Sequence, residues 1–171
     1  GLVSPHEGGE GGIPVGAPSL SDRARPLPRI SIQAFCVTPD LAETVQAASE
    51  DRRLSKAHVT IQMGGTAAAV AHYQENPTPN LIVLESHASH ANLIAELEEL
   101  AQSCDPGTKV VIVGQANDVV LYRDLMRRGI SEYLVAPVSP FELMECLSSL
   151  YNNPDSDPVG QVYAFIGAKE I

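Results

Sequence analysis

The sequence contains no tryptophan, and aromatic residues make up only 5% of its 171 residues. Lys and Arg number 11 against 21 Asp and Glu, which gives a formal net charge of -10 at pH 7. A surface of that sign repels nucleic acid and anionic lipid, because binding either one needs a basic footprint. We therefore expect no nucleic-acid partner, and a basic protein surface is the more compatible kind of partner.

No apolar run reaches the roughly 18 residues of a membrane-spanning helix, and no signal peptide is visible, so direct membrane insertion is not expected. The three cysteines, Cys36, Cys104 and Cys146, have neither the spacing of a zinc site nor that of a disulfide framework. Reduced, buried thiols in a cytoplasmic protein are the simplest interpretation.

The composition changes along the chain. Residues 1–29 are rich in Gly and Pro and poor in large apolar residues, which predicts a flexible leader. Residues 30–151 alternate short β-rich runs with helical stretches, which predicts one domain. A polar, Pro-containing linker is expected at 152–160, and residues 161–171 are expected to form the first strand of a second domain that is truncated here.

Five βα units are expected in the main domain. The strands are predicted at 30–37, 58–63, 81–85, 109–114 and 131–136. The helices between them begin at caps, such as Thr38 before Pro39, Asn117 or Asp118, and the capping box Ser139–Glu142. This order predicts a doubly wound, five-stranded parallel sheet of the flavodoxin-like α/β class, with helices on both faces. Function in such sheets gathers at the carboxyl ends of the strands.

The order of these units, and strand-end stretches such as EYLVAPVSPFEL, resemble the receiver domain of two-component response regulators. The resemblance covers about residues 30–151 and implies the receiver-like fold. In that family an Asp at the end of the third strand accepts a phosphoryl group, and an acidic pair after the first strand holds Mg²⁺. A Ser or Thr after the fourth strand and a Lys before a Pro after the fifth contact the phosphoryl oxygens.

Each of these positions is altered in the present sequence. Glu85 stands at the phosphoacceptor position, and Asp40 is the one carboxylate near the place of the metal pair. Gln115 (or Gly114, if the register slips by one) falls at the hydroxyl position, and the lysine position falls on Ala136 of the pair Ala136–Pro137. A carboxylate misplaced by about 1 Å can cost on the order of 10²-fold in rate, and nothing here neutralises the developing charge. We therefore expect a domain that does not accept phosphate.

Two interpretations of Glu85 stay open: a solvated acid at a strand end, or a fixed charge that imitates the phosphorylated state. His87 and His90 follow it in a loop, but a zinc site needs at least one further ligand that the sequence does not supply, so no metal is expected.

Arg123, Arg127 and Arg128 on the fourth helix, together with Tyr133, form a candidate partner face. Receivers commonly dimerise through the fourth helix, fifth strand and fifth helix, so the resemblance implies that a homodimer is possible. A solvated helix face is the alternative interpretation.

The stretch GQVYAFIGAK, residues 160–169, looks like the first strand of a ParA/MinD-type ATPase leading into a deviant Walker A loop. The pattern holds through Lys169 and breaks at Glu170, where that family has Gly. A receiver-like domain, a linker and this strand, in that order, resemble the CpaE/TadZ proteins of tight-adherence (Flp) pilus assembly, and the Gly/Pro-rich leader fits them as well.

This resemblance implies a role in placing the pilus secretion machinery at a cell pole, through contacts with other pilus or secretion proteins or a polar landmark protein. An intact ATPase half would bind ATP and Mg²⁺ with Lys169 in its phosphate-binding loop, but no cofactor and no enzymatic activity are expected of this chain. The alternatives are a phospho-accepting receiver that uses Asp40, and a small-molecule sensor beside the short Ala-rich second helix.

Overall fold

Strand and helix alternate through residues 25–152, the part of the chain that the structure, a computed structural model, describes. The strands are β1 (Ser31–Cys36), β2 (His58–Met63), β3 (Leu81–Glu85), β4 (Lys109–Gly114) and β5 (Glu132–Val135). The helices are α3 (Pro39–Ser49), α4 (Thr66–Tyr73), α5 (His90–Ala101), α6 (Val119–Arg127) and α7 (Pro140–Asn152), with the 3₁₀ turn η1 (Arg52–Leu54) after α3. The predicted bounds of β2, β3 and β4 are confirmed, and β1 and β5 are one residue shorter at each end.

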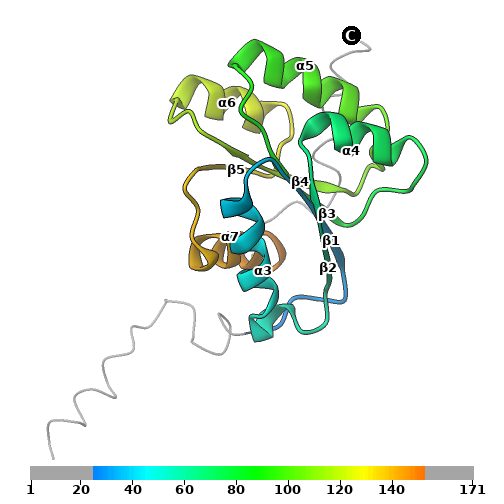
Figure 1. The fold of residues 1–171 in the computed structure, drawn as a ribbon, viewed down its shortest axis with the longest axis vertical. Coiled ribbons are helices and arrows are strands. Elements are labelled where there is room, and N and C mark those ends of the chain that lie inside the picture. Colours follow the sequence, from blue (N-terminus) through cyan, green and yellow to red (C-terminus); the bar gives the residue numbers. More distant parts are fainter. Residues whose placement is uncertain (1–24, 153–171) are drawn as a thin grey trace, which may run out of the picture.

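The five strands form one parallel sheet in the order β2-β1-β3-β4-β5. Helices α3 and α7 cover one face of this sheet, and α4, α5 and α6 cover the other (Figure 1). The predicted doubly wound, flavodoxin-like fold is therefore confirmed. Because all strands run the same way, the loops that follow them lie at one edge of the sheet, and β1 lies next to β3 there.

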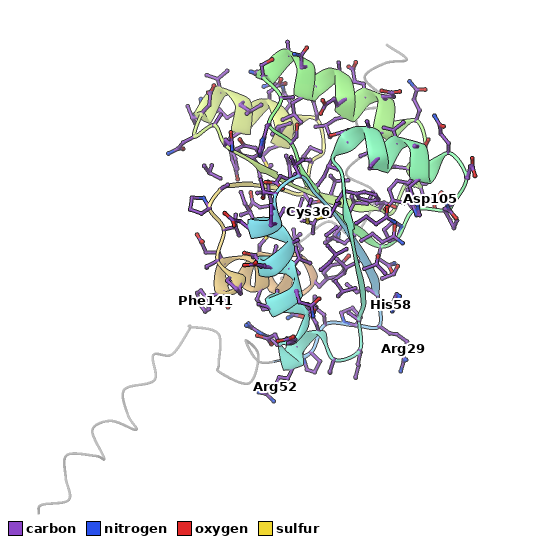
Figure 2. All side chains as sticks on the ribbon, viewed as in Figure 1. Arg29, Cys36, Arg52, His58, Asp105 and Phe141 are labelled. Atoms are coloured by element: carbon purple, nitrogen blue, oxygen red, sulfur yellow. The ribbon has the colours of Figure 1, made fainter. Side chains whose placement is uncertain are left out.

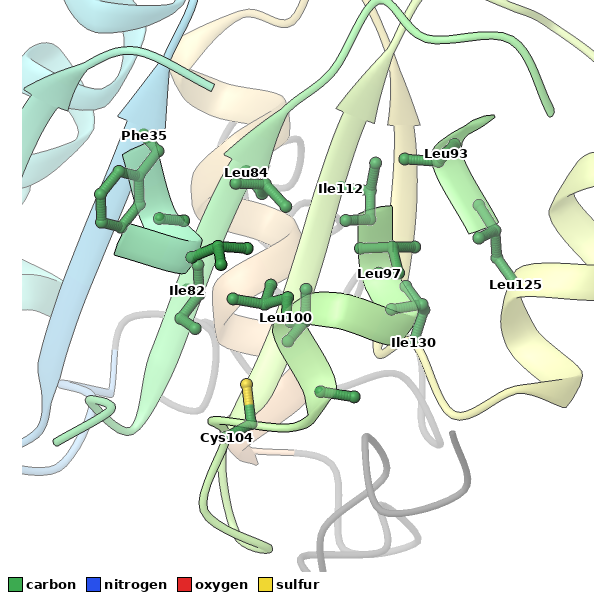
Figure 3. Close-up of a cluster of buried hydrophobic side chains, with 14 of the residues drawn as sticks. Phe35, Ile82, Leu84, Leu93, Leu97, Leu100, Cys104, Ile112, Leu125 and Ile130 are labelled. Carbon is green, nitrogen blue, oxygen red and sulfur yellow. The ribbon is translucent and has the colours of Figure 1, made fainter. Parts of the chain in front are cut away.

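Alternate side chains of the strands enter two separate cores, as the period of a strand requires. On the side of α5, Ile82, Leu84 and Ile112 pack against Leu97 and Leu100 (Figure 3). The central strands β3 and β4 are buried along their whole length, whereas the edge strand β2 is exposed or half-buried. Helices on both faces thus explain why the central strands read as continuous apolar runs.

The predicted helix caps are present and give the loops their direction. The Thr38 hydroxyl accepts a hydrogen bond from the amide of Leu41 at 3.3 Å, ahead of Pro39 in the first turn. Of the two candidates for α6, Asp118 is the cap, since its carboxylate accepts from the second and third residues of the helix. The box at α7 is reciprocal: the Glu142 amide donates to the Ser139 hydroxyl, and the Ser139 amide donates to the Glu142 carboxylate.

The packed region begins before Ile30, the residue at which the sequence places the start of the domain. Leu27 is fully buried, and its amide donates to the carbonyl of Arg53 at 2.7 Å. Residues 1–24 of the leader, residues 153–160 of the linker and the ATPase-like strand with Lys169 lie outside the described residues. Within residues 25–152, none of the helices has the length and apolar character that crossing a membrane would need.

Candidate functional site

A cavity of about 750 Å³ opens at the carboxyl edge of the sheet, between α3 and the loop that joins β5 to α7. Glu85, Asp40, Gln115, Ala136 and Pro137 all line it. The structure therefore brings together in one place the five residues that the sequence assigns to the altered phosphoacceptor site. Cys36 marks this edge at the end of β1, far from His58 and Arg29 at the opposite edge (Figure 2).

Glu85 is not a solvated acid, and that interpretation is wrong: the residue is only 2% exposed. Its Oε1 accepts hydrogen bonds from the backbone amides of Val37 at 2.6 Å and Thr38 at 2.8 Å. The Thr38 hydroxyl lies 2.9 Å from Oε2, and His87 Nε2 lies 3.3 Å from the same oxygen. The carboxylate is thus held by the loop between β1 and α3.

The geometry of this clamp follows from the order of the strands. Glu85 ends β3, and Val37 and Thr38 follow β1, which is the neighbouring strand. The amides lie just ahead of α3, where the positive end of the helix dipole favours a negative charge. Two amides and a hydroxyl satisfy a carboxylate that burial would otherwise make costly. Glu85 therefore links the end of β3 to the loop that follows β1. The carboxylate that the second interpretation treats as an imitation of a phosphorylated residue is buried among hydrogen-bond donors.

Of the other altered positions, Asp40 alone carries an ionisable group. Gln115 and Pro137 are exposed, Ala136 is half-buried, and the Ala136 amide donates to the carbonyl of Gly114 at 2.8 Å. The Ala136–Pro137 peptide bond is cis. Asp40 is exposed in the first turn of α3. Lysine, arginine and histidine are absent from the thirteen described residues that line the cavity.

Tyr133, predicted to lie on a partner face, is instead 6% exposed and belongs to the core, so that prediction is wrong. Its hydroxyl donates to the carbonyl of Ala116 at 2.8 Å, which holds the loop after β4. A Cβ added at Gly114 would lie 2.5 Å from that hydroxyl and 2.8 Å from a ring carbon. The sequence has glycine at the end of β4 because the Tyr133 ring fills the space of a side chain.

The three arginines of the candidate partner face differ in exposure. Arg123 is exposed, and Arg127, with 73% of its side chain exposed, pairs with Asp124 at 3.0 Å. Arg128 turns toward α5, with contacts of 2.9 Å to Asp124 and 3.4 Å to Glu98. Arg128 therefore joins two helices of this chain rather than presenting its charge outward.

The two histidines after β3 have different partners, and His90, expected in a loop, is the first residue of α5. His87 contacts Glu85, whereas His90 Nε2 lies 2.8 Å from the carboxylate of Asp124 on α6. Among residues 25–152, no three His, Cys, Asp or Glu side chains gather closely enough to hold a metal ion.

All three cysteines are free, as the sequence predicts. Burial raises the pKa of the Cys36 thiol to about 11, with a further contribution from the nearby Glu85. Burial likewise raises the pKa of Cys104 and that of Cys146 to about 12. These thiols are therefore protonated and unreactive at neutral pH.

Residues of α3 that the sequence did not single out also form the site. Glu43, Thr44 and Ala47 line the cavity with Asp40, and the Thr44 hydroxyl donates to the carbonyl of Val138 at 2.9 Å. Their spacing of three and four residues was the available signal, since it places them on one helix face. This cavity lies beside α3, and α4, the Ala-rich helix of the sensor alternative, contributes none of its lining.

No protein-family model and no curated protein matches the chain. Solved structures, however, do match the chain. A two-component response regulator from Clostridium difficile aligns with a TM-score of 0.56 over 74% of this chain and 98% of its own, at 15% identity. Such an identity shows the fold alone. Fold and strand-end positions together define a domain of the receiver-like class.

Two pilus assembly proteins are far more similar in sequence. CpaE from Caulobacter crescentus is 48% identical, with a TM-score of 0.72 over 74% of this chain and 97% of its own. A chain from Sinorhizobium meliloti, described as a CpaE2 pilus assembly protein, is 42% identical, with a TM-score of 0.67 over 68% and 96%. The present chain belongs to the CpaE family of pilus assembly proteins.

Proposed function

We propose that this receiver-like domain does not accept phosphate and serves pilus assembly as a module for protein–protein contact and localisation. The observation that carries the proposal is the clamp on Glu85. In a phosphoryl-accepting site a carboxylate oxygen must face the incoming phosphorus. Here both oxygens of Glu85 lie against groups of Val37, Thr38 and His87, and the residue is 2% exposed.

The charges around the site support the same conclusion. Transfer of a phosphoryl group needs cations to offset the developing negative charge. Asp40 and Glu43 add negative charge to the cavity, and Ala136 brings no amino group to it. A phosphoryl group would therefore meet repulsion on entry.

Treatment with acetyl phosphate, or with beryllofluoride, in the presence of Mg²⁺ tests this proposal. We expect intact-protein mass spectrometry to show no added phosphoryl group and amide NMR spectra to stay unchanged at the ends of the strands. A receiver known to be phosphorylated, treated in parallel, is the positive control. Stoichiometric modification at Glu85 or Asp40 would establish the rival function, a signalling receiver.

The partners we propose are proteins of the pilus or secretion machinery, or a polar landmark that recruits this domain to a cell pole or to the inner-membrane secretion complex. The membership of the CpaE family supports this proposal, because the relatives at 48% and 42% identity are described as pilus assembly proteins. An ATPase half that binds ATP and Mg²⁺ through Lys169 is proposed from the sequence pattern alone.

A further inference from the structure

The cavity at the carboxyl edge has the form of a groove along α3. Asp40, Glu43 and Ala47 stand on one wall at helical spacing, and residues 136–138 with Pro140 form the other wall. The hydrogen bond from Thr44 to Val138 ties the two walls together, so the groove belongs to the packed structure. Its volume of about 750 Å³ suits a few side chains.

The groove is lined by acidic residues, and none of its thirteen described lining residues is basic. Asp40 and Glu43 are exposed at its wall, and Glu85 lies at its base. The carboxylate of Glu85 accepts hydrogen bonds from backbone amides and a hydroxyl, which are dipoles and carry no net charge. His87 Nε2, which lies 3.3 Å from the same carboxylate, does not line the groove. The formal charge of the whole chain, -10, adds to the same potential. Anions such as nucleotides are therefore disfavoured and cations favoured.

Two exposed apolar residues, Pro140 and Phe141, lie at the start of α7, next to the groove. Pro140 lines the groove, and Phe141 follows it in the chain, whereas the apolar lining residues Leu41, Val113 and Val138 are buried. Phe141 is 69% exposed, a large value for an aromatic residue, and projects at the outer side of α7 (Figure 2). An apolar surface beside carboxylates is the pattern of a peptide-binding site, where an aromatic anchor and a charged contact act together.

We propose that this groove docks a segment of a partner protein that inserts a Lys or Arg side chain between Asp40 and Glu43. Apolar side chains next to that cation pack on Pro140 and Phe141. The inference rests on the proposed function, since it names the surface and the partner chemistry of the interaction module. The cation supplies from outside the positive charge that the groove itself lacks.

Two matched tripeptides test the docking site on the 171-residue chain. The first is acetyl-Phe-Lys-Leu-amide, and the second replaces lysine with norleucine, which keeps the alkyl chain and removes the charge. Both are titrated to millimolar concentration while amide NMR shifts are followed. We expect the lysine peptide to shift amides of residues 38–47 and 136–141, and to bind several-fold more tightly than the norleucine peptide.

Charge variants locate the contact. In the double variant Asp40→Asn, Glu43→Gln, the affinity for the lysine peptide is expected to fall by about three- to tenfold, the range of two exposed ion pairs. The affinity for the norleucine peptide is expected to stay unchanged. Glu99→Gln on α5 is the matched control, because this exposed carboxylate lies on the opposite face of the sheet and does not line the groove. Phe141→Ala is expected to lower the affinity for both peptides.

Several results would overturn the docking site. They are equal affinity for the two peptides, no loss in the double variant, shifts confined to other elements, and no shift at all. Binding of butylamine as tight as that of the lysine peptide would show a site for small cations in place of a peptide groove. Phosphoryl transfer to Glu85 or Asp40 would refute the proposed function itself, whereas a failed titration with no phosphorylation would refute the groove alone.

Discussion

At the scale of single residues, the carboxylate of Glu85 at the end of β3 has a structural role, because it holds the loop between β1 and α3. Glu85 receives two amides and a hydroxyl from a loop 47 and 48 residues away in sequence. Thr38 serves twice, since its hydroxyl caps α3 and also contacts the Glu85 carboxylate. The same atoms that would make Glu85 a candidate reactive group therefore hold β1 and β3 loops together.

Replacing Glu85 with alanine is expected to lower the free energy of unfolding by about 2–4 kcal/mol, because the amides of Val37 and Thr38 lose their acceptor inside the protein. Glu85→Gln keeps a carbonyl oxygen at the right distance and should cost clearly less. Urea denaturation measures both. The control is His87→Ala. The His87 ring is more exposed, and its contact with the Glu85 carboxylate, at 3.3 Å, is the longest of those made with this group. Equal losses for Ala and Gln would show that the acceptor geometry is not what stabilises the loop.

Gly114 and Tyr133 are a second case at this scale, because the Tyr133 ring packs directly against the backbone of Gly114. Gly114→Ala is expected to destabilise the domain by about 1–3 kcal/mol, because the new methyl group meets the Tyr133 ring. Gly107→Ala is the matched control, since a Cβ there has nothing within 4 Å, and it should be close to neutral. Thermal or urea unfolding of both variants makes the comparison. A G114A protein as stable as the parent would mean that Tyr133 leaves its place at little cost.

At the scale of elements, α5 and α6 are joined by a polar cluster as well as by the core beneath them. Asp124 of α6 contacts His90 at the start of α5 and Arg128, the residue that caps the end of α6, and Arg128 extends to Glu98. Burial opposes ionisation of Asp124, but the hydrogen bonds from His90 and Arg128 outweigh it and lower the pKa of this carboxyl. The helix that carries the candidate arginines is thereby fixed to its neighbour.

This shift has a defined pH dependence. A carboxyl whose pKa is lower in the folded state stabilises it above the unfolded pKa, near 3.8, and that contribution is lost as pH falls through the folded pKa. Asp124→Asn should therefore be less stable than the parent at pH 7, with a difference that shrinks on acidification below about pH 4. Urea titrations across this range measure it. A difference that stays constant into strong acid would contradict the role of the charge.

At the scale of the whole molecule, the fold is receiver-like, whereas the residues at its carboxyl edge differ from the receiver pattern. A parallel sheet flanked by helices is specified by apolar runs, helix caps and turns, and the sequence contains all of these features. The edge where the strands end contributes little to the core, so its residues can change without loss of the fold. The groove between α3 and the β5–α7 loop occupies this edge.

The sequence by itself determined the sheet, the helix starts and the reduced cysteines. Strand period, caps and spacing act within a few residues, so the chain shows them directly. The five residues that meet at the carboxyl edge were assigned to one site by the resemblance to receivers, and the fold brings them together.

Only the tertiary structure decided what those residues do. The burial of Glu85, the inward place of Tyr133 over Gly114 and the link from Arg128 to Glu98 all join residues that are distant along the chain. Such contacts depend on which strands and helices become neighbours and on which rotamers fit between them. Periodicity along the chain carries no information about either, which is why the sequence left two interpretations of Glu85 open and the burial of the residue is decided by the fold.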